Sequence, residues 1–458
     1  MSSNPEYNWY GNIQCHGGRV VHPESEDELA NILGNDAEYP SPVRPCGSRH
    51  SITPCMAASA GERGWGTLVD LSRLQGPLRV DEQAATVTVG PGRRYIDVAR
   101  ALRTRGWQFH VNTEIGSLTM GSAACVGTKD SSFPGEFGQV GSYANSVRLV
   151  SADGRVRSID QRDPDFAALR SSYGLLGVVS EATYRIAPIE DISIEHEEIE
   201  LGEFEAASRR WLDGRTAVFL YLFPYANRVV AELRRKVGGD SGKASKSVAM
   251  RNFFWGKGVP RVARLGSHLP SHVSREMLFQ SEDLVVRKYL AHLLEVERFN
   301  PVDQIIDFEH ATKFTFSMWG FAADRFAAIL PQYFAFCREQ RRQIDFRSSM
   351  PDACYHIAQD QSSLLSYSYD GPVWTVDPVS TGIEAGWDDF LRAFNDRCDA
   401  WGGVPLFNQT PWLQRRHVER AFGVRLARFE ETRRRFDPRD RLLNDYFRQL
   451  LPVATEGR

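Results

Sequence analysis

The chain has 458 residues, more than one ordinary hydrophobic core accommodates, so we expect two domains, or three, with room for a sizeable pocket between them. Its 55 basic and 58 acidic residues nearly balance and form no basic tail or stripe, which argues against nucleic-acid binding. No apolar run is long enough to span a membrane and the first residues carry no signal-peptide pattern, which favours a cytoplasmic protein without a membrane partner.

Cysteine usage favours the same compartment. The seven cysteines are scattered along the chain and form no C-x-x-C pair, which argues against a zinc site or a disulfide framework. We therefore expect no metal ligands and mostly reduced thiols. No pattern in the sequence predicts an oligomeric state.

Residues 15–190 have the pattern of short strands with intervening helices. β-branched runs ended by Gly, Asp or Pro predict strands within 41–46, 66–71, 85–90, 145–159 and 177–186. In the fourth run, Ala152-Asp153-Gly154 predicts a tight hairpin turn, with Gly154 at a positive φ. Apolar residues at helical spacing predict a helix over 95–106. This mixture is typical of an α+β fold.

Longer helices follow residue 190, where we expect a second domain to begin. Helical patterns cover 275–299 and 324–343, and strands are expected at 353–359 and 364–370. The tail, 417–451, is predicted to be helical apart from a break at Asp437-Pro438.

Four glycine-containing stretches could lie against a phosphate. "GPGRRYIDVA" lacks the third glycine of a dinucleotide fingerprint and is interpreted as a strand-to-helix turn. "PCGSRHS", residues 45–51, places small residues in succession, and exposed backbone N–H groups of such a loop can hold a pyrophosphate. "TMGSAACVGTKDSS", 119–132, and "YGLLGVVSEATYRI", 173–186, offer further close approaches. Alone, each is more often a plain turn, and His50 alone is more often a solvated loop residue.

Five motifs follow one another along the chain: "NWYGN", "RPCGSRHS", "TMGSAACVGT", "SADG" and "YGLLGVVSEATYRI". In this order they resemble the vanillyl-alcohol-oxidase (PCMH-type) flavoproteins, in the branch of alditol and aldonolactone oxidases. The end of the chain, "RFDPRDRLLNDYF", is similar to that branch as well. The resemblance implies an α+β, two-domain flavoprotein. An FAD-binding domain would cover 1–190, a cap domain with an antiparallel sheet and flanking helices 191–423, and C-terminal helices, 424–458, would return to the FAD domain.

The resemblance also implies how FAD is held. His50 would bond covalently to the flavin, and Cys125 would be a small buried residue beside it and not a second link. Met120-Gly121-Ser122 would face the reactive edge, where small residues leave room for O2. The other cofactor residues it implies are Cys46, Gly47, Ser48, Arg49, Ser51, Ser117, Gly121, Ser122, Gly127, Thr128, Gly177 and Val179.

The cap departs from the branch pattern. Where aldonolactone oxidases carry Glu-x-Arg, the ungapped alignment places Cys354 and His356, and where they carry the Lys of His-Trp-x-Lys it places Gln409. The Gly-Thr-His of the branch becomes Gly-Thr-Lys at Lys129. With the charged groups of the sugar site replaced, we expect a largely apolar pocket and a larger, less polar organic substrate.

Candidate catalytic residues follow from the same alignment. His356 is the candidate base beside the flavin, or else a histidine that satisfies a core hydrogen bond. Alternation along the strand places Cys354 and His356 on one face, toward the site, with Tyr355 pointing away. Tyr367 and Tyr369, on the following strand, are possible hydroxyl partners or packing residues, and Gln409 could hydrogen-bond a substrate carbonyl or the flavin edge.

These features predict an FAD-dependent oxidoreductase, an oxidase more than a dehydrogenase, that removes hydride from a carbon bearing oxygen or nitrogen and passes electrons to O2. One alternative is an oxidative cyclase or desaturase of secondary metabolism. The other is a flavin-bound binding protein without catalysis.

Overall fold

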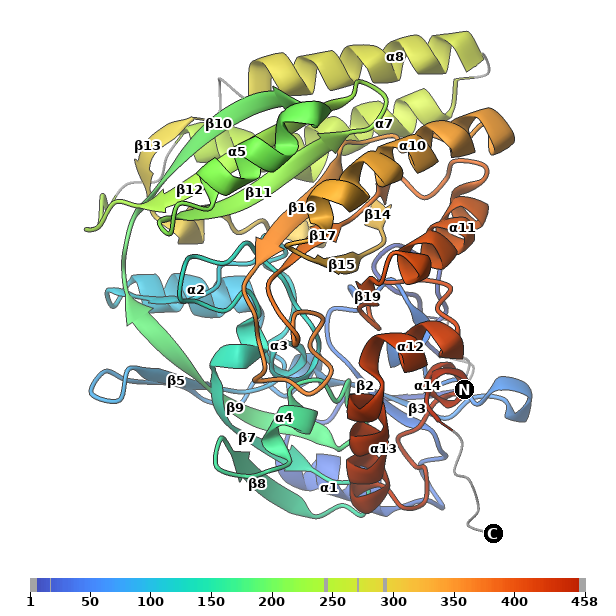
Figure 1. Ribbon diagram of the computed structural model, residues 1–458. Helices are drawn as coiled ribbons and strands as arrows, with labels where there is room; N and C mark the ends of the chain where they lie inside the picture. The colour runs from blue at the N-terminus through green and yellow to red at the C-terminus, as the bar shows by residue number, and fades with distance from the viewer. Residues whose placement is uncertain (1–5, 17, 243–245, 270–271, 291–294, 453–458) are drawn as a thin grey trace.

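The computed structural model describes residues 6–16, 18–242, 246–269, 272–290 and 295–452, which form two lobes (Figure 1). The lower lobe in Figure 1 contains most of the chain before residue 190, and the upper lobe contains a long antiparallel sheet with helices on its faces. No helix in the described part of the chain is long and apolar enough to cross a membrane.

The lower lobe is built on two sheets. A parallel sheet has the order β1-β3-β2, and an antiparallel sheet has the order β4-β5-β9-β7-β8, with β6 pairing on β9. Their bounds are β1 Arg19–Val21, β2 Val43–Cys46, β3 Thr67–Asp70, β4 Leu78–Asp81, β5 Thr86–Val89, β6 Trp107–Phe109, β7 Ala144–Val150, β8 Val156–Asp160 and β9 Val178–Pro188. The helices are α1 Glu26–Gly34, α2 Tyr95–Arg103, α3 Met120–Cys125 and α4 Phe166–Leu169.

The strands predicted before residue 190 are confirmed by β2, β3, β5, β7, β8 and β9. Helix α2 buries the predicted residues Ile96, Val98, Ala99 and Leu102 in the core of this lobe. Strands β7 and β8 form the predicted hairpin, with Gly154 at φ 80°.

The upper lobe contains an eight-stranded sheet of order β13-β10-β12-β11-β16-β17-β15-β19. The bounds are β10 Ile192–Glu200, β11 Thr216–Phe223, β12 Arg228–Lys236, β13 Val296–Phe299, β15 Trp319–Ala322, β16 Asp352–Ile357, β17 Val373–Val376 and β19 Val404–Pro405, with β14 Thr315–Phe316 and β18 Val379–Ser380 as a separate pair. The helices of the second half are α5 Phe204–Trp211, α6 Lys246–Phe253, α7 Val259–Ser267, α8 His272–Val285, α10 Phe326–Ile344, α11 Trp387–Ala400, α12 Arg415–Phe422, α13 Val424–Phe436 and α14 Asp445–Leu450.

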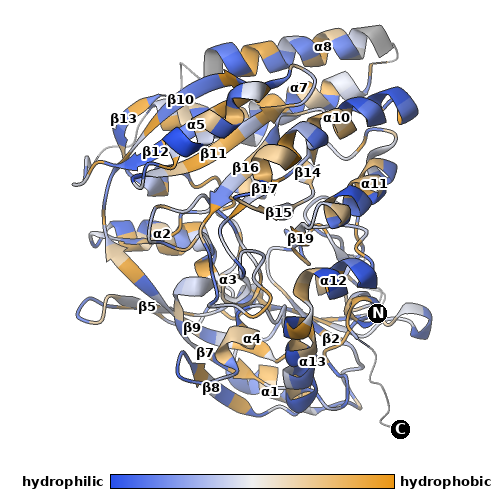
Figure 2. Ribbon diagram, viewed as in Figure 1, coloured by the Kyte–Doolittle hydropathy of each residue, from blue (hydrophilic) through white to orange (hydrophobic). Residues whose placement is uncertain are grey.

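The two faces of the large sheet pack against different partners. One face packs Val218, Leu220 and Cys354 against α5, α10 and α11, and Figure 2 shows strand β11 as strongly apolar. The opposite face carries Phe219, Tyr221 and Tyr355, which pack with α7. Because side chains alternate along a strand, successive residues of one strand contribute to opposite faces of the sheet.

Two predicted elements of the upper lobe are wrong. Residues 364–370 form turns and not a strand, because the hydroxyl of Ser366 accepts the backbone N–H of Ser368 and so competes with a strand ladder. The end of the helix expected over 275–299 is strand β13, because Val296 and Phe299 pair with Ile194 and Ile192 of β10. The sheet edge overrides the local helical pattern.

The tail of the chain is tied to strand β2. The buried guanidinium of Arg44 donates to the carbonyl of Leu442 at 2.8 Å, and that of Arg441 donates to the carbonyl of Ile32 at 2.7 Å. Helices α12, α13 and α14 place Val418, Phe422 and further residues in the same core as α2 and α3. These contacts fix the end of β2, from which the loop 46–51 starts.

Candidate active site

A groove of about 130 Å³ runs through the lower lobe between the loop after β2 and helix α3. All the predicted cofactor residues except Ser117 line it, and Cys125 lines it as well. Ser117 contacts two of them, because it bonds the ring of His50 and its carbonyl accepts the Ser48 hydroxyl. Residues far apart in the sequence are thus brought to one groove, as the motif order predicted.

The loop 46–51 presents its backbone to this groove. A Cβ at Gly47 would lie 2.1 Å from Thr119 Oγ1, so only glycine lets the loop pass so close to α3. Within the described ranges, the backbone N–H groups of Ser48, Arg49, His50 and Ser51 donate to no protein acceptor. Such a run of free donors fits a pyrophosphate, which makes the groove suitable for a dinucleotide such as FAD.

The imidazole of His50 is neutral at neutral pH. Its Nε2 lies 2.6 Å from Ser117 Oγ, and the ring of Trp9 lies 5.3 Å away, centroid to centroid. Burial lowers the pKa of His50 to about 4, and the opposing charge of Asp307 is too weak to restore it. A neutral ring nitrogen is the form that can act as a nucleophile.

A second cavity of about 160 Å³ lies between the lobes and meets the groove. Ile115, Leu118, Thr128, Phe316 and Gln409 line both spaces. Aromatic side chains form a large part of its wall: Phe219, Tyr221, Trp255, Phe308, Phe314, Phe316 and Tyr355. A molecule in this cavity would therefore lie beside whatever occupies the groove.

A buried polar cluster, Lys129, Asp377 and Gln409, stands where the two spaces meet. Lys129 Nζ lies 2.8 Å from Asp377 Oδ2, and the same ammonium donates to Gln409 Oε1. The lysine and aspartate side chains are only 7% and 3% exposed, and Asp377 Oδ1 is left without a partner. Burial raises the pKa of Asp377, with Lys129 opposing the shift. One oxygen of this carboxylate is therefore buried and unpaired among the described residues.

Cys354 and His356 lie on one face of β16, as predicted, but on the face away from the site. Cys354 packs into the core with Leu220, and the ring of His356 lies 4.9 Å from that of Trp374. Neither residue lines the groove or the cavity, whereas Tyr355 lines the cavity. The predicted orientation is thus wrong, because the pairing of β16 with β11 turns the odd-numbered residues toward the lower lobe.

The two predicted tyrosines also lie outside both spaces, in a loop and not on a strand. The hydroxyl of Tyr367 donates to the carbonyl of Thr128 at 3.0 Å and so supports a residue that lines both spaces. Tyr369 lies under the guanidinium of Arg425, 4.4 Å from its ring centre. Of the candidate catalytic residues, only Gln409 reaches the site directly.

Sequence reasoning missed the charged groups of the cavity. The lining of the cavity is largely apolar, as expected, but Glu114, Lys129, Asp130 and Asp377 also line it. These charges come from segments other than the two cap motifs, so the alignment of those motifs alone did not reveal them. The substitution of lysine for the branch histidine at Lys129 was the available signal.

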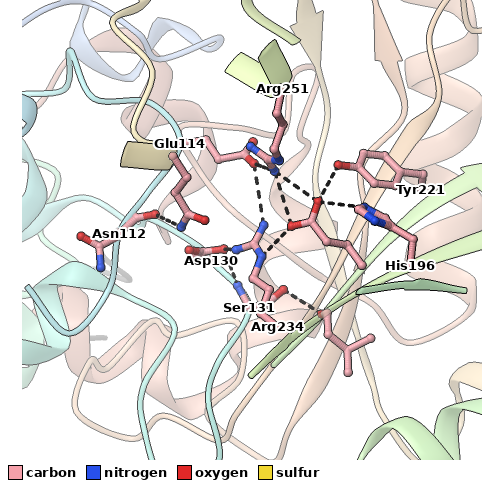
Figure 3. Close-up of polar contacts among 11 residues, drawn as sticks. Asn112, Glu114, Asp130, Ser131, His196, Tyr221, Arg234 and Arg251 are labelled. Atoms are coloured by element: carbon pink, nitrogen blue, oxygen red, sulfur yellow. Dashed lines mark hydrogen bonds and ion pairs between the residues drawn. The ribbon is translucent and has the colours of Figure 1, made fainter. Parts of the chain in front are cut away.

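Two of these carboxylates belong to a buried ionic network (Figure 3). Glu232 accepts from Arg234 Nε at 2.6 Å and from the hydroxyl of Tyr221 at 2.9 Å. Arg234 also binds Asp130, at 2.9 Å, and Arg251 lies 3.4 Å from Glu232. Further members are Glu114, which pairs with Arg251, and His196, whose Nε2 lies 3.6 Å from Glu232 Oε2.

A groove with free backbone donors, opening on a second cavity that contains a buried lysine–aspartate pair, fits a flavin-dependent oxidoreductase by class. Comparison with known families agrees: a model described as FAD binding domain matches residues 18–160, and one described as D-arabinono-1,4-lactone oxidase matches 182–450. The second spans more than half of the chain, and the chain belongs to the D-arabinono-1,4-lactone oxidase family.

Individual relatives support this assignment. L-gulono-1,4-lactone dehydrogenase of Mycobacterium tuberculosis is 25% identical over 458 residues, which cover 97% of this chain and 98% of that protein. D-arabinono-1,4-lactone oxidase of Eremothecium gossypii is 30% identical over 264 residues, 56% of this chain and 46% of that protein. Cholesterol oxidase from Brevibacterium sterolicum has the same fold, with a TM-score of 0.74 at 14% identity over 98% of this chain and 96% of that one.

The predicted class is thereby confirmed. The chain is an FAD-dependent oxidoreductase of the aldonolactone and alditol oxidase type, with a two-lobed α+β fold. The groove of the lower lobe lies largely within the part that matches the FAD binding domain. The cavity between the lobes is lined from both matched parts.

Proposed function

We propose that this protein oxidises the C–OH carbon of a ring-sized organic molecule to a carbonyl, with Asp377 as the base. The observation that carries the proposal is the Lys129–Asp377 pair at the junction of the two spaces. Asp377 lines a cavity in which an alcohol could lie, and its buried Oδ1 has no hydrogen-bond partner among the described residues. A carboxylate whose pKa is raised by burial is a stronger base than one in water.

Different side chains of the protein contribute to different steps of the proposed reaction. When bound, the flavin would supply the acceptor for the hydride that leaves the carbon. Asp377 Oδ1 accepts the hydroxyl proton, and the ammonium of Lys129 stabilises the negative charge that develops on the oxygen. Gln409 holds that ammonium in place through its Oε1. Aromatic side chains of the cavity wall would limit the contact of water with the reacting carbon.

We further propose that FAD is attached through His50 and that O2 accepts the electrons. The buried neutral imidazole in the groove supports the attachment. Small residues, Gly121, Ser122 and Ala123, line the groove and leave room for O2. The cytoplasm is the proposed compartment, because all seven cysteines are free and buried.

Paired variants at the cluster test the proposed chemistry. We expect Asp377→Asn and Lys129→Met to lower the rate of anaerobic flavin reduction by roughly 100-fold while FAD stays bound. Since Lys129→Met leaves a buried carboxylate unpaired, the double variant Lys129→Met/Asp377→Asn controls for folding. Asp370→Asn removes a carboxylate that is 80% exposed and serves as the matched control. An unchanged reduction rate in Asp377→Asn would remove this residue as the base.

A further inference from the structure

The buried ionic network beside the cavity carries one uncompensated negative charge. It contains the carboxylates of Glu114, Asp130 and Glu232 and the guanidiniums of Arg234 and Arg251. The neighbouring Lys129–Asp377 pair is neutral as a whole. His196, the remaining titratable ring of the network, adds no charge unless it binds a proton. A buried, uncompensated charge is costly, and a cationic ligand would remove that cost.

The negative side of the network faces the cavity. Glu114 and Asp130 line the cavity, whereas the guanidiniums of Arg234 and Arg251 are only 2% and 1% exposed and lie behind them. Figure 3 shows Arg234 between Asp130 and the deeper part of the network. Arg251 binds Glu114 through Oε1, and Oε2 of Glu114 has no hydrogen bond within the described residues. One carboxylate oxygen is therefore available at the cavity wall.

Aromatic faces surround this end of the cavity. The rings of Tyr221 and Trp255 are stacked, with centroids 4.9 Å apart and planes 7° from parallel. The ring of Phe219 meets those of Tyr221 and Tyr355 edge to face, at 4.6 and 4.7 Å. Burial raises the pKa of both tyrosines, so their rings are neutral phenols. Aromatic faces beside a carboxylate are the surroundings that an ammonium group prefers.

The volume of the cavity limits what it can hold. Its size of about 160 Å³ is close to that of an engineered protein cavity of about 150 Å³ that holds one benzene molecule. A single six-membered ring with short substituents matches this space. The proposal below therefore takes a monocyclic substrate.

We propose that the substrate is a monocyclic alcohol that carries a protonated aliphatic amine. The ammonium group binds between Glu114 and the aromatic side chains beside it, Tyr221 and Trp255, and the hydroxyl binds at Asp377. The position of the hydroxyl rests on the proposed function, whereas the position of the ammonium rests only on the network and the aromatic wall. The two ends can therefore be tested separately.

A series of three benzyl alcohols that differ in charge tests the ammonium end. The probes are meta-(aminomethyl)benzyl alcohol, a cation at neutral pH, meta-ethylbenzyl alcohol, its neutral analogue, and meta-(hydroxymethyl)benzoate, an anion. Calorimetry on the FAD-loaded protein should show the cation binding about tenfold more tightly than the neutral alcohol, with the anion weakest. Equal affinities of cation and neutral alcohol would overturn the proposal.

Variants locate the effect. Glu114→Gln should reduce the preference for the cation to about twofold or less without changing the affinity for the neutral alcohol. Glu309→Gln, at a carboxylate that is 62% exposed, should keep the full preference. Because Glu114→Gln leaves Arg251 with one partner fewer, Glu114→Asp is used as a second variant. The comparison of the three alcohols on the wild-type protein depends on neither variant. A preference that persists in both variants would overturn the assignment to Glu114.

Flavin bleaching separates this proposal from the one on which it depends. If the cation binds preferentially but none of the three alcohols bleaches the flavin under anaerobic conditions, the oxidation at Asp377 is contradicted and the ammonium site stands. If all three bleach it and bind equally well, the ammonium site is contradicted and the oxidation stands.

Discussion

The Nε2 atom of His50 lies 2.6 Å from the hydroxyl oxygen of Ser117, and this contact distinguishes the two ring nitrogens. Nδ1 has no hydrogen-bond partner among the described residues, and the ring lines the groove. Because burial lowers the pKa of His50 to about 4, the free nitrogen carries a lone pair at neutral pH whenever the proton resides on Nε2. We therefore predict that the proposed covalent link to flavin forms at Nδ1.

Denaturing precipitation of the purified protein checks this attachment. We expect flavin colour to remain in the pellet for the wild type and to pass into the supernatant for His50→Ala. Ser117→Ala should slow the attachment, because the ring loses the contact that fixes its orientation and its proton. Mass spectrometry of the flavin-bearing peptide reads out the linkage, and complete release of flavin from the wild type would contradict it.

The close approach of Gly47 to Thr119 predicts a strong effect of one methyl group. In Gly47→Ala the added Cβ would lie 2.1 Å from Thr119 Oγ1, so the loop must move away from α3 and its free N–H groups lose their positions. We expect the affinity for FAD, measured by calorimetry on apoprotein, to fall by roughly tenfold or more. Gly202→Ala, where the Cβ meets nothing within 4 Å, is the matched control.

Rescue distinguishes this steric cause from general unfolding. Removing the hydroxyl in Gly47→Ala/Thr119→Ala should recover part of the affinity. No recovery, together with a lowered Tm of Gly47→Ala, would attribute the loss to the fold and not to the position of the loop.

The FAD groove could be predicted from the sequence, and the catalytic face could not. Small residues at Gly47, Gly121 and Gly127 are a local signal, because close backbone approach needs glycine wherever the partner lies. The orientation of β16 depends instead on its pairing with β11. The alternation of Cys354, Tyr355 and His356 assigns them to two opposite faces of the strand but does not indicate which face points toward the site.

The pairing of charges that are far apart in the chain could not be predicted from the sequence either. Lys129 and Asp377 are far apart in the chain and meet only when the lobes come together. The domain limits at 190 and 423 stay predictions, although Val418 and Phe422 of α12 already pack with the first core.

The reversed face of β16 yields a pair of opposite predictions for Tyr355 and His356. Tyr355 lines the cavity, so Tyr355→Ala should raise KM about tenfold for an aromatic alcohol by removing a wall of the site. His356→Ala should leave kcat and KM within about twofold, because its ring packs on Trp374 outside both spaces. Steady-state kinetics of the two variants decide the matter. A loss of kcat in His356→Ala with FAD content unchanged would restore the histidine as the base.

His356 should instead affect the dependence of stability on pH. Burial lowers the pKa of this ring to about 4, whereas in the unfolded chain it has the ordinary value near 6.5. Between these values the unfolded state binds more protons than the folded state, so acid favours unfolding. The stability is complete above about pH 6.5 and is lost as the pH falls toward 4. One such histidine costs about 2 kcal/mol of unfolding free energy between pH 7 and pH 5.

Urea unfolding of wild type and His356→Gln at the two pH values measures this contribution. The variant loses the contact with the ring of Trp374 at both pH values, so the absolute stabilities are not the comparison of interest. The difference between pH 7 and pH 5 should shrink by about 2 kcal/mol in the variant, because glutamine does not titrate. His50 has a similarly lowered pKa and lies in the lower lobe, and its contribution persists in both proteins and cancels. An identical pH dependence in the two proteins would show that His356 takes up a proton as readily in the folded chain as in the unfolded one.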